Sequence, residues 1–163
     1  MNIELRRVEP GDYKAVCAVH AQPNALAGTL QLPFPSEEMW KKRLEAGNDE
    51  RYALVACIEG EIVAMGGLDL FPKSPRRRHA GHIGLAVHDK WQSKGVGTAL
   101  MKALIEVADN WLNLSRLELT VFNDNQPALR LYKKLGFELE GTHRKYAFRD
   151  GSYVDAYTMA RVR

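Results

Sequence analysis

The sequence lacks any long apolar segment and any recognisable export signal. No run of apolar residues approaches the roughly 20 that a helix needs to cross a bilayer, although 45% of the 163 residues are hydrophobic. The N-terminus lacks the basic-then-apolar profile of a secretory signal. We therefore expect a cytoplasmic protein with no membrane partner. With 26% charged residues the composition is that of an ordinary globular chain, and its length fits one domain over residues 1–163.

Cysteine is scarce, and the chain has no cluster of metal-binding residues along its sequence. Cys17 and Cys57 both lie in apolar surroundings, where a lone cysteine is usually a small buried hydrophobe. The cysteines and histidines do not show the two closely spaced ligand pairs of a zinc knuckle. We expect no metal site, and two free thiols fit a reducing compartment.

The chain also lacks a strong charge of either sign. A net charge of +3 is too small to indicate a nucleic-acid partner. The basic cluster Arg76-Arg77-Arg78 is typical of a solvated loop. The alternative is a positive rim that attracts a polyanionic cofactor.

Hydrophobic periodicity predicts alternating strands and helices. Strands are expected at 3–8, 52–59, 61–70, 80–87, 117–122, 137–148 and 153–162, and helices at 13–21, 37–46, 96–112 and 127–135. Ser36 should cap the second helix, and Gly47-Asn48-Asp49 should end it. Residues 23–35 contain Gly28 and three prolines, so they are expected to form an irregular connection.

This order of elements predicts an α+β (mixed α/β) protein with a mixed central sheet and helices on both faces. Helices separate the strands at 80–87, 117–122 and 137–148, which favours parallel pairing among them. The strands at 52–59 and 61–70, and the last two around Asp150-Gly151, should form antiparallel hairpins.

A glycine-rich turn joins the strand at 80–87 to the long helix that follows. Gly95 and Gly97 stand where that helix begins, with free amide N–H groups at the positive end of its dipole. Glycine lets a ligand approach the backbone closely, so the turn is suited to a pyrophosphate. A dinucleotide-binding fingerprint does not fit, because Leu100 replaces its third glycine. A Walker-type loop does not fit either, because no Gly-Lys-Ser/Thr closes it.

Two separate motifs carry a family resemblance. The run Gln92-Ser93-Lys94-Gly95-Val96-Gly97 resembles the Gln/Arg-x-x-Gly-x-Gly/Ala signature of the GNAT acetyltransferases. The segment Asn125 to Phe137 is similar to that family's Asn-x-x-Ala-x-x-Leu-Tyr-x-x-x-Gly-Phe segment. The resemblance implies the GNAT acyl-CoA N-acyltransferase fold and acetyl-CoA as cosubstrate. Stretches such as Thr29-Leu30-Gln31 and Tyr153-Val154-Asp155-Ala156-Tyr157 are similar, more narrowly, to a group of bacterial L-amino-acid N-acetyltransferases.

The resemblance also implies where acetyl-CoA binds. In the family, the pantetheine arm lies between two splayed parallel strands, and the signature loop holds the pyrophosphate. The residues so implied are Leu85, Ala86, Val87, Gln92, Ser93, Lys94, Gly95, Val96, Gly97, Thr98, Asn125, Lys133 and Lys134.

Acetyl transfer to an amine requires an acid and a base. When the amine attacks the thioester, a tetrahedral intermediate forms and expels a thiolate. The resemblance implies that Tyr132 is the acid that protonates this thiolate. The amine must first lose a proton. His82, because histidine is suited to proton transfer at physiological pH, and Glu118 on the neighbouring strand are the candidate bases, directly or through a water relay.

The acceptor is expected to be the α-amine of a free L-amino acid. Arg144 and Lys145 are candidates to pair with its carboxylate. A protein N-terminus, a polyamine, an amine-bearing toxin and a non-catalytic acetyl-CoA-sensing module remain alternatives. A polyamine would favour an acidic pocket, and only Glu37 and Glu38 lie near the expected one. A homodimer through the edge of the last hairpin is a further expectation by analogy. The residues expected to line the acceptor pocket are Thr29, Leu30, Gln31, Phe34 and Tyr146.

Overall fold

The computed structural model of the chain describes residues 1–47 and 49–163. Its strands are β1 (Glu4–Arg7), β2 (Arg51–Ile58), β3 (Glu61–Leu70), β4 (Ala80–Val87), β5 (Arg116–Phe122), β6 (Glu138–Arg149) and β7 (Ser152–Val162). Its α-helices are α1 (Tyr13–His20), α2 (Pro23–Ala27), α3 (Glu37–Glu45), α4 (Val96–Asn110) and α5 (Gln126–Lys134). Short 3-10 turns lie at η1 (Pro10–Asp12), η2 (Pro75–Arg77) and η3 (Asp89–Trp91). Within these residues, no helix is both long and apolar enough to span a bilayer.

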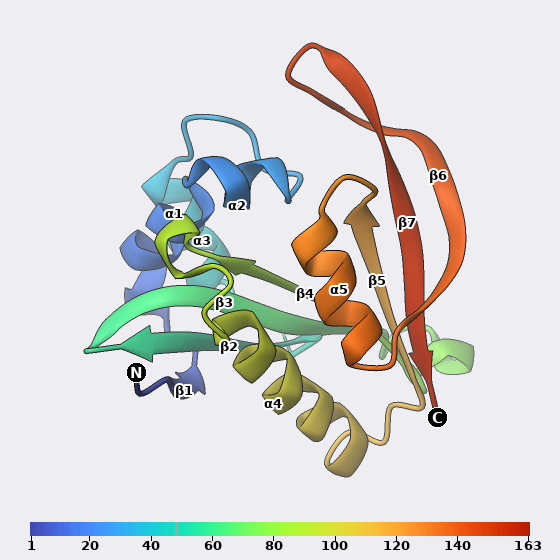
Figure 1. Ribbon diagram of the computed structural model, residues 1–163. Coiled ribbons are helices and arrows are strands. Elements are labelled where there is room, and N and C mark those ends of the chain that lie inside the picture. The colour runs from blue at the N-terminus through green and yellow to red at the C-terminus, as the bar shows by residue number, and fades with distance from the viewer. Residues whose placement is uncertain (48) are drawn as a thin grey trace.

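The strands form a mixed seven-stranded sheet in the order β1-β2-β3-β4-β5-β7-β6 (Figure 1). Neighbouring strands run antiparallel from β1 to β4 and again from β5 to β6. Only β4 and β5 pair in parallel among the described strands. The long helix α4 connects these two strands, as a parallel crossover requires. The predicted mixed sheet is confirmed.

Helices cover both faces of this sheet, and the alternation along β2 explains why. Successive side chains of a strand point to opposite faces, so a strand buried on both sides is apolar throughout. One set of β2 side chains packs with α1 and α3, and this set is Ala53, Val55 and Cys57. The other set packs with α4 and α5 in the larger core, and it is Leu54, Ala56 and Ile58.

Helix α2 corrects the prediction of an irregular connection over residues 23–35. Pro23 occupies the first turn of this helix, where a missing N–H costs nothing. The amide N–H groups of Asn24 and Ala25 donate to the carboxylate of Asp89, at 2.9 and 3.1 Å. Because Asp89 is distant in sequence, local patterning could not reveal this partner.

The last hairpin corrects the predicted parallel pairing of 117–122 with 137–148. Strand β7 lies between β5 and β6, so β5 pairs with β7 in antiparallel orientation. Burial explains the placement, because β7 contributes the buried Ala156 and Met159 to the core. Strand β6 is almost wholly exposed and therefore takes the edge.

The predicted cap of α3 is present, because the Ser36 hydroxyl oxygen accepts a hydrogen bond from the Met39 amide at 3.2 Å. The helix ends at Glu45, close to the predicted Ala46. Of the predicted stop signal, Asn48 lies outside the described residues.

Candidate active site

A cleft opens where β4 and β5 stop pairing. The parallel ladder holds only Ala80–Arg116, Gly81–Leu117 and His82–Glu118. Strand β4 remains paired with β3 as far as Val87, and β5 remains paired with β7 as far as Phe122. The two strands therefore separate from each other beyond His82. The cleft has a volume of about 1310 Å³ and is lined on its two strands by residues 82–87 and 120–122. Ligand pockets for drug-sized molecules span roughly 300–1,000 Å³, so the cleft has room for two substrates.

The N-terminus of α4 forms one end of this cleft. Gly95 has a φ of 87°, a left-handed conformation that favours glycine. A Cβ at Gly97 would lie 3.2 Å from Leu85 Cδ1, which is tighter than ordinary contact. The Gln92 side chain fixes the loop, because its Nε2 donates to the Val87 carbonyl at 3.0 Å. Free helical amides without a covering side chain form an anion cradle that fits the pyrophosphate of acetyl-CoA.

Helix α5 places Tyr132 in the cleft wall. Asn125 begins the helix, with its Oδ1 accepting from the Ala128 amide at 3.3 Å. Tyr132 is buried and its ring lies 5.9 Å from that of Phe137. Burial raises the pKa of the Tyr132 phenol to about 12. The hydroxyl is therefore neutral at physiological pH and retains a proton to donate.

The two candidate bases lie in different environments. His82 is half-buried, lines the cleft and occupies the last pair of the parallel ladder. Its Nδ1 lies 3.9 Å from Asp69 Oδ2.

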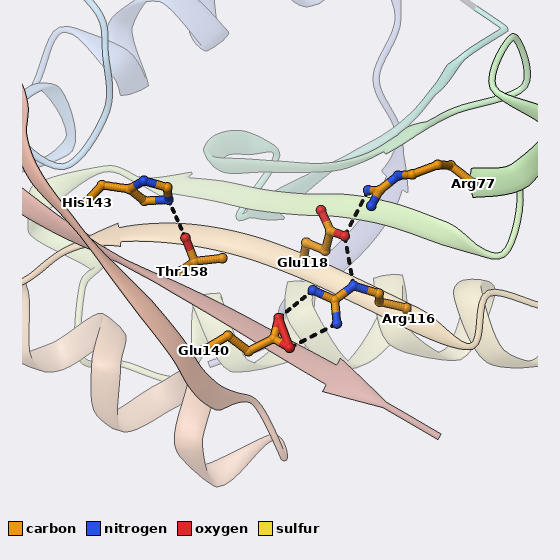
Figure 2. Close-up of polar contacts among 6 residues, drawn as sticks. All are labelled: Arg77, Arg116, Glu118, Glu140, His143 and Thr158. Atoms are coloured by element: carbon orange, nitrogen blue, oxygen red, sulfur yellow. Dashed lines mark hydrogen bonds and ion pairs between the residues drawn. The ribbon is translucent and has the colours of Figure 1, made fainter.

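Glu118 is held by two arginines instead. Its Oε1 accepts from Arg116 Nε and Arg77 Nη2, both at 2.8 Å, and Arg116 also binds Glu140 (Figure 2). Burial alone raises the pKa of Glu118, but the bonds from both arginines outweigh it and lower the pKa below its usual value. Glu118 is not among the cleft residues. The geometry therefore disfavours it as a base.

The cleft brings together most of the residues expected from the sequence. The cofactor-binding candidates that line it are Leu85, Ala86, Val87, Gln92, Ser93, Gly95, Gly97, Thr98, Asn125 and Lys134. The acceptor-pocket candidates that line it are Thr29, Leu30, Gln31 and Tyr146.

Four other expected residues do not line the cleft. The Val96 side chain is fully buried in the core, so only its backbone is available to a ligand. Lys94 stacks on the Trp91 ring at 5.1 Å, and Lys133 is exposed. The Phe34 side chain is 99% exposed, because the connection carries it away from the cleft.

Two groups of basic residues lie away from the cleft. Arg76–Arg78 precede the N-terminal end of β4, whereas the cradle follows its C-terminal end, so the cluster does not form a rim around the cradle. Arg77 instead packs over the Phe71 ring at 5.0 Å and binds Glu118. Arg144 and Lys145 do not line the cleft; they line a smaller depression that shares Tyr146 with it.

The cleft also contains residues that no sequence motif marks. Trp40 and Arg43 come from α3, Arg51 from the start of β2, and His20 from the end of α1. Their spacing along the sequence is that of ordinary core and surface positions. In the part of the chain that the structure describes, no group of three or more His, Cys, Asp or Glu could hold a metal ion.

Comparisons with known proteins agree with this geometry. The family model described as acetyltransferase (GNAT) family matches residues 20–137. The L-amino acid N-acetyltransferase AaaT of Escherichia coli (strain K12) is 50% identical over 161 residues, covering 99% of this chain and 98% of that protein. The spermine/spermidine N(1)-acetyltransferase of Bacillus subtilis (strain 168) is 27% identical, covering 86% and 91%. A phosphinothricin acetyltransferase of Sinorhizobium meliloti, crystallised with acetyl-CoA, has a TM-score of 0.86 at 22% identity, covering 99% and 89%.

Proposed function

Because this chain belongs to the GNAT family of acetyltransferases, we propose that it transfers the acetyl group of acetyl-CoA to the α-amine of a free L-amino acid. The relative that is 50% identical over nearly the full length is an L-amino acid N-acetyltransferase, which supports this choice of acceptor.

The charge of the cleft is the observation that carries the choice of acceptor. Its wall includes Arg43, Arg51 and Arg149, whereas its carboxylates are those of Asp124 and Asp150. Arg149 binds Asp124 and Arg51 binds Asp69, so the cleft charges without an ion pair in the described chain are those of Arg43, Arg130, Lys134 and Asp150. A polyamine would meet like charge in this cleft, whereas an amino acid brings a carboxylate that arginine binds well. The amino-acid acceptor therefore fits better than the polyamine.

The proposed reaction assigns one step to each of two side chains. His82, at the vertex of the cleft, takes a proton from the ammonium group directly or through water. The free amine attacks the thioester carbonyl, and the carbon–sulfur bond breaks. Tyr132 donates its phenolic proton to the departing thiolate, and the proton that the attacking nitrogen loses as the amide forms returns to the Tyr132 phenolate through water.

An acceptor panel tests the proposed function. Purified protein with acetyl-CoA should release free thiol when supplied with L-amino acids, and less with polyamines or short peptides. Mass spectrometry of the product should place the acetyl group on the α-nitrogen. Release with polyamines or peptides alone would retain acetyl transfer but reject the amino-acid acceptor.

A substitution tests the role of His82. Replacing His82 by asparagine should lower kcat/KM at neutral pH by roughly tenfold or more, because a positioned base is lost. A kcat/KM equal to that of the wild type would remove His82 from the proton transfer.

We also propose a cytoplasmic location and a homodimer, with no nucleic-acid or membrane partner. Two free buried cysteines fit a reducing compartment. The exposed edge strand β6 offers unpaired backbone groups to a second copy. A net charge of +3 gives little attraction to polyanions.

A further inference from the structure

Helix α3 forms one wall of the cleft, and Arg43 is held in place at this wall. Its guanidinium carbon lies 5.0 Å from the centre of the Trp40 ring, one helical turn earlier on α3. Its Nη1 donates to the Gln31 side-chain oxygen at 3.2 Å. All three residues line the cleft. Stacking and one hydrogen bond restrict the guanidinium but leave most of its donors available.

Arg43 differs from the other arginines at this wall in having no acidic partner. Arg51 Nη1 lies 2.5 Å from Asp69 Oδ1, and Arg149 binds Asp124. No carboxylate of the described residues forms an ion pair with Arg43. Its positive charge is therefore available to an anionic ligand in the cleft.

Trp40 gives an independent sign of a polar ligand at the same wall. Its side chain is 6% exposed, and its Nε1 is buried without a hydrogen-bond acceptor among the described residues. Buried donors rarely lack a partner, and such exceptions call for an explanation. The His20 ring lies 4.3 Å from that of Trp40, and burial lowers the pKa of His20. The neighbouring imidazole is therefore neutral and leaves Arg43 as the cation of this wall that has no ion pair among the described residues.

The position of this wall matches one end of an amino acid. Helices α1 and α3 pack on one face of the sheet, whereas α4 and α5, which carry the anion cradle and Tyr132, pack on the other. The cleft passes between β4 and β5 and reaches both groups of helices. An acceptor whose amine reaches the gap from the α3 side places its other polar group against Arg43.

We propose that Arg43, stacked on Trp40, binds the α-carboxylate of the acceptor and so selects amino acids over amines that lack a carboxylate. This inference rests on the proposed function and names the residue that would give it its specificity. Arg130 and Lys134, the other cleft cations without an ion pair in the described chain, lie on α5 beside the cofactor end. They are placed for the phosphates rather than for the acceptor.

The test compares an L-amino acid with its own carboxamide, which keeps the side chain and the amine but removes the negative charge. Kinetics of both acceptors are measured for the wild type, Arg43→Gln, Arg43→Lys and Lys42→Gln. The preference for the acid over the amide is then compared between variants, so that the different reactivities of the two amines cancel. Lys42 is the matched control, because it is an exposed cation on α3 that pairs with Glu38 and lies outside the cleft.

Arg43→Gln should reduce the preference for the acid by roughly tenfold, mainly through a higher KM for the acid. Arg43→Lys should fall between the wild type and Arg43→Gln, because it keeps the charge but loses the planar fork. Lys42→Gln should keep the wild-type preference. Thermal unfolding and acetyl-CoA binding of each variant should match the wild type.

An unchanged preference in Arg43→Gln, or an equal loss with both acceptors, would overturn the carboxylate role while the wild-type activity upheld the proposed function. Turnover of peptides or polyamines without any turnover of amino acids by the wild type would overturn both. The two failures are therefore distinguishable in one set of assays.

Discussion

Replacing Tyr132 by phenylalanine should lower kcat by about 100-fold and leave the affinity for acetyl-CoA nearly unchanged. Tyr132 is buried in the cleft wall, and the substitution keeps the ring that packs against Phe137. Only the hydroxyl is lost, so the departing thiolate would lack its proton donor. Because the pKa of this phenol is raised to about 12, the wild type should keep its acid protonated up to at least pH 10.

The measurement is single-turnover kinetics with saturating acetyl-CoA, combined with calorimetry of acetyl-CoA binding. Tyr52→Phe is the matched control, because Tyr52 lies outside the cleft. The guanidinium carbon of Arg7 lies 4.1 Å from the centre of the Tyr52 ring. Retention of wild-type kcat in Tyr132→Phe would remove the acid role. A fall in binding equal to the fall in rate would instead assign Tyr132 a role in holding the cosubstrate.

Replacing Gly97 by valine should weaken acetyl-CoA binding by about 100-fold or more, the second large effect. A Cβ here lies 3.2 Å from Leu85 Cδ1 and 3.5 Å from Leu131 Cδ2, and the two methyl groups beyond it would project into this crowded turn. The turn holds the free amides proposed to bind the pyrophosphate, so even a small displacement separates donors from the phosphate oxygens.

Calorimetry of acetyl-CoA binding gives the direct readout. Gly11→Val is the control, because a Cβ at Gly11 meets no atom within 4 Å. Both variants should remain folded by circular dichroism. Wild-type affinity in Gly97→Val would show that the cosubstrate does not approach this turn closely.

The sequence predicts best what depends on neighbours along the chain. The bounds of β3 and β4, the start of α4 and the Ser36 cap follow from periodicity, glycine and capping residues. The bounds of α1, α3 and α5 differ from expectation by about one residue, within the usual fraying of helix ends.

The errors arise where a distant partner decides the outcome. Helix α2 depends on Asp89, far along the chain. The insertion of β7 beside β5 depends on which hairpin strand has the more buried side chains. Glu118 stays an untested candidate base, but its ion pairs could not be foreseen either, because Arg77 and Arg116 converge on it only after folding.

The same limit explains the candidate site. Two sequence motifs indicate the end of the cleft proposed to bind the cofactor, because an anion cradle built from the backbone requires glycine at fixed spacing. No motif indicates the wall proposed to bind the acceptor, because any side chain of suitable shape and charge can bind a ligand there. Arg43 shows no signal until its Trp40 partner, its Gln31 contact and its lack of an acid are seen together.

The short parallel ladder has a consequence for the energetics of ligand entry. Since β4 and β5 are joined at only three residue pairs, ending with His82–Glu118, the gap beyond them belongs to the resting fold. A ligand that enters it breaks no hydrogen bond between these strands, and it replaces only water on their facing backbone groups. The free energy needed to keep the strands apart is therefore part of the stability of the protein itself. Because folding has already separated the strands, this free energy is not subtracted from the affinity of each ligand that binds. This is the advantage of a preorganised binding site.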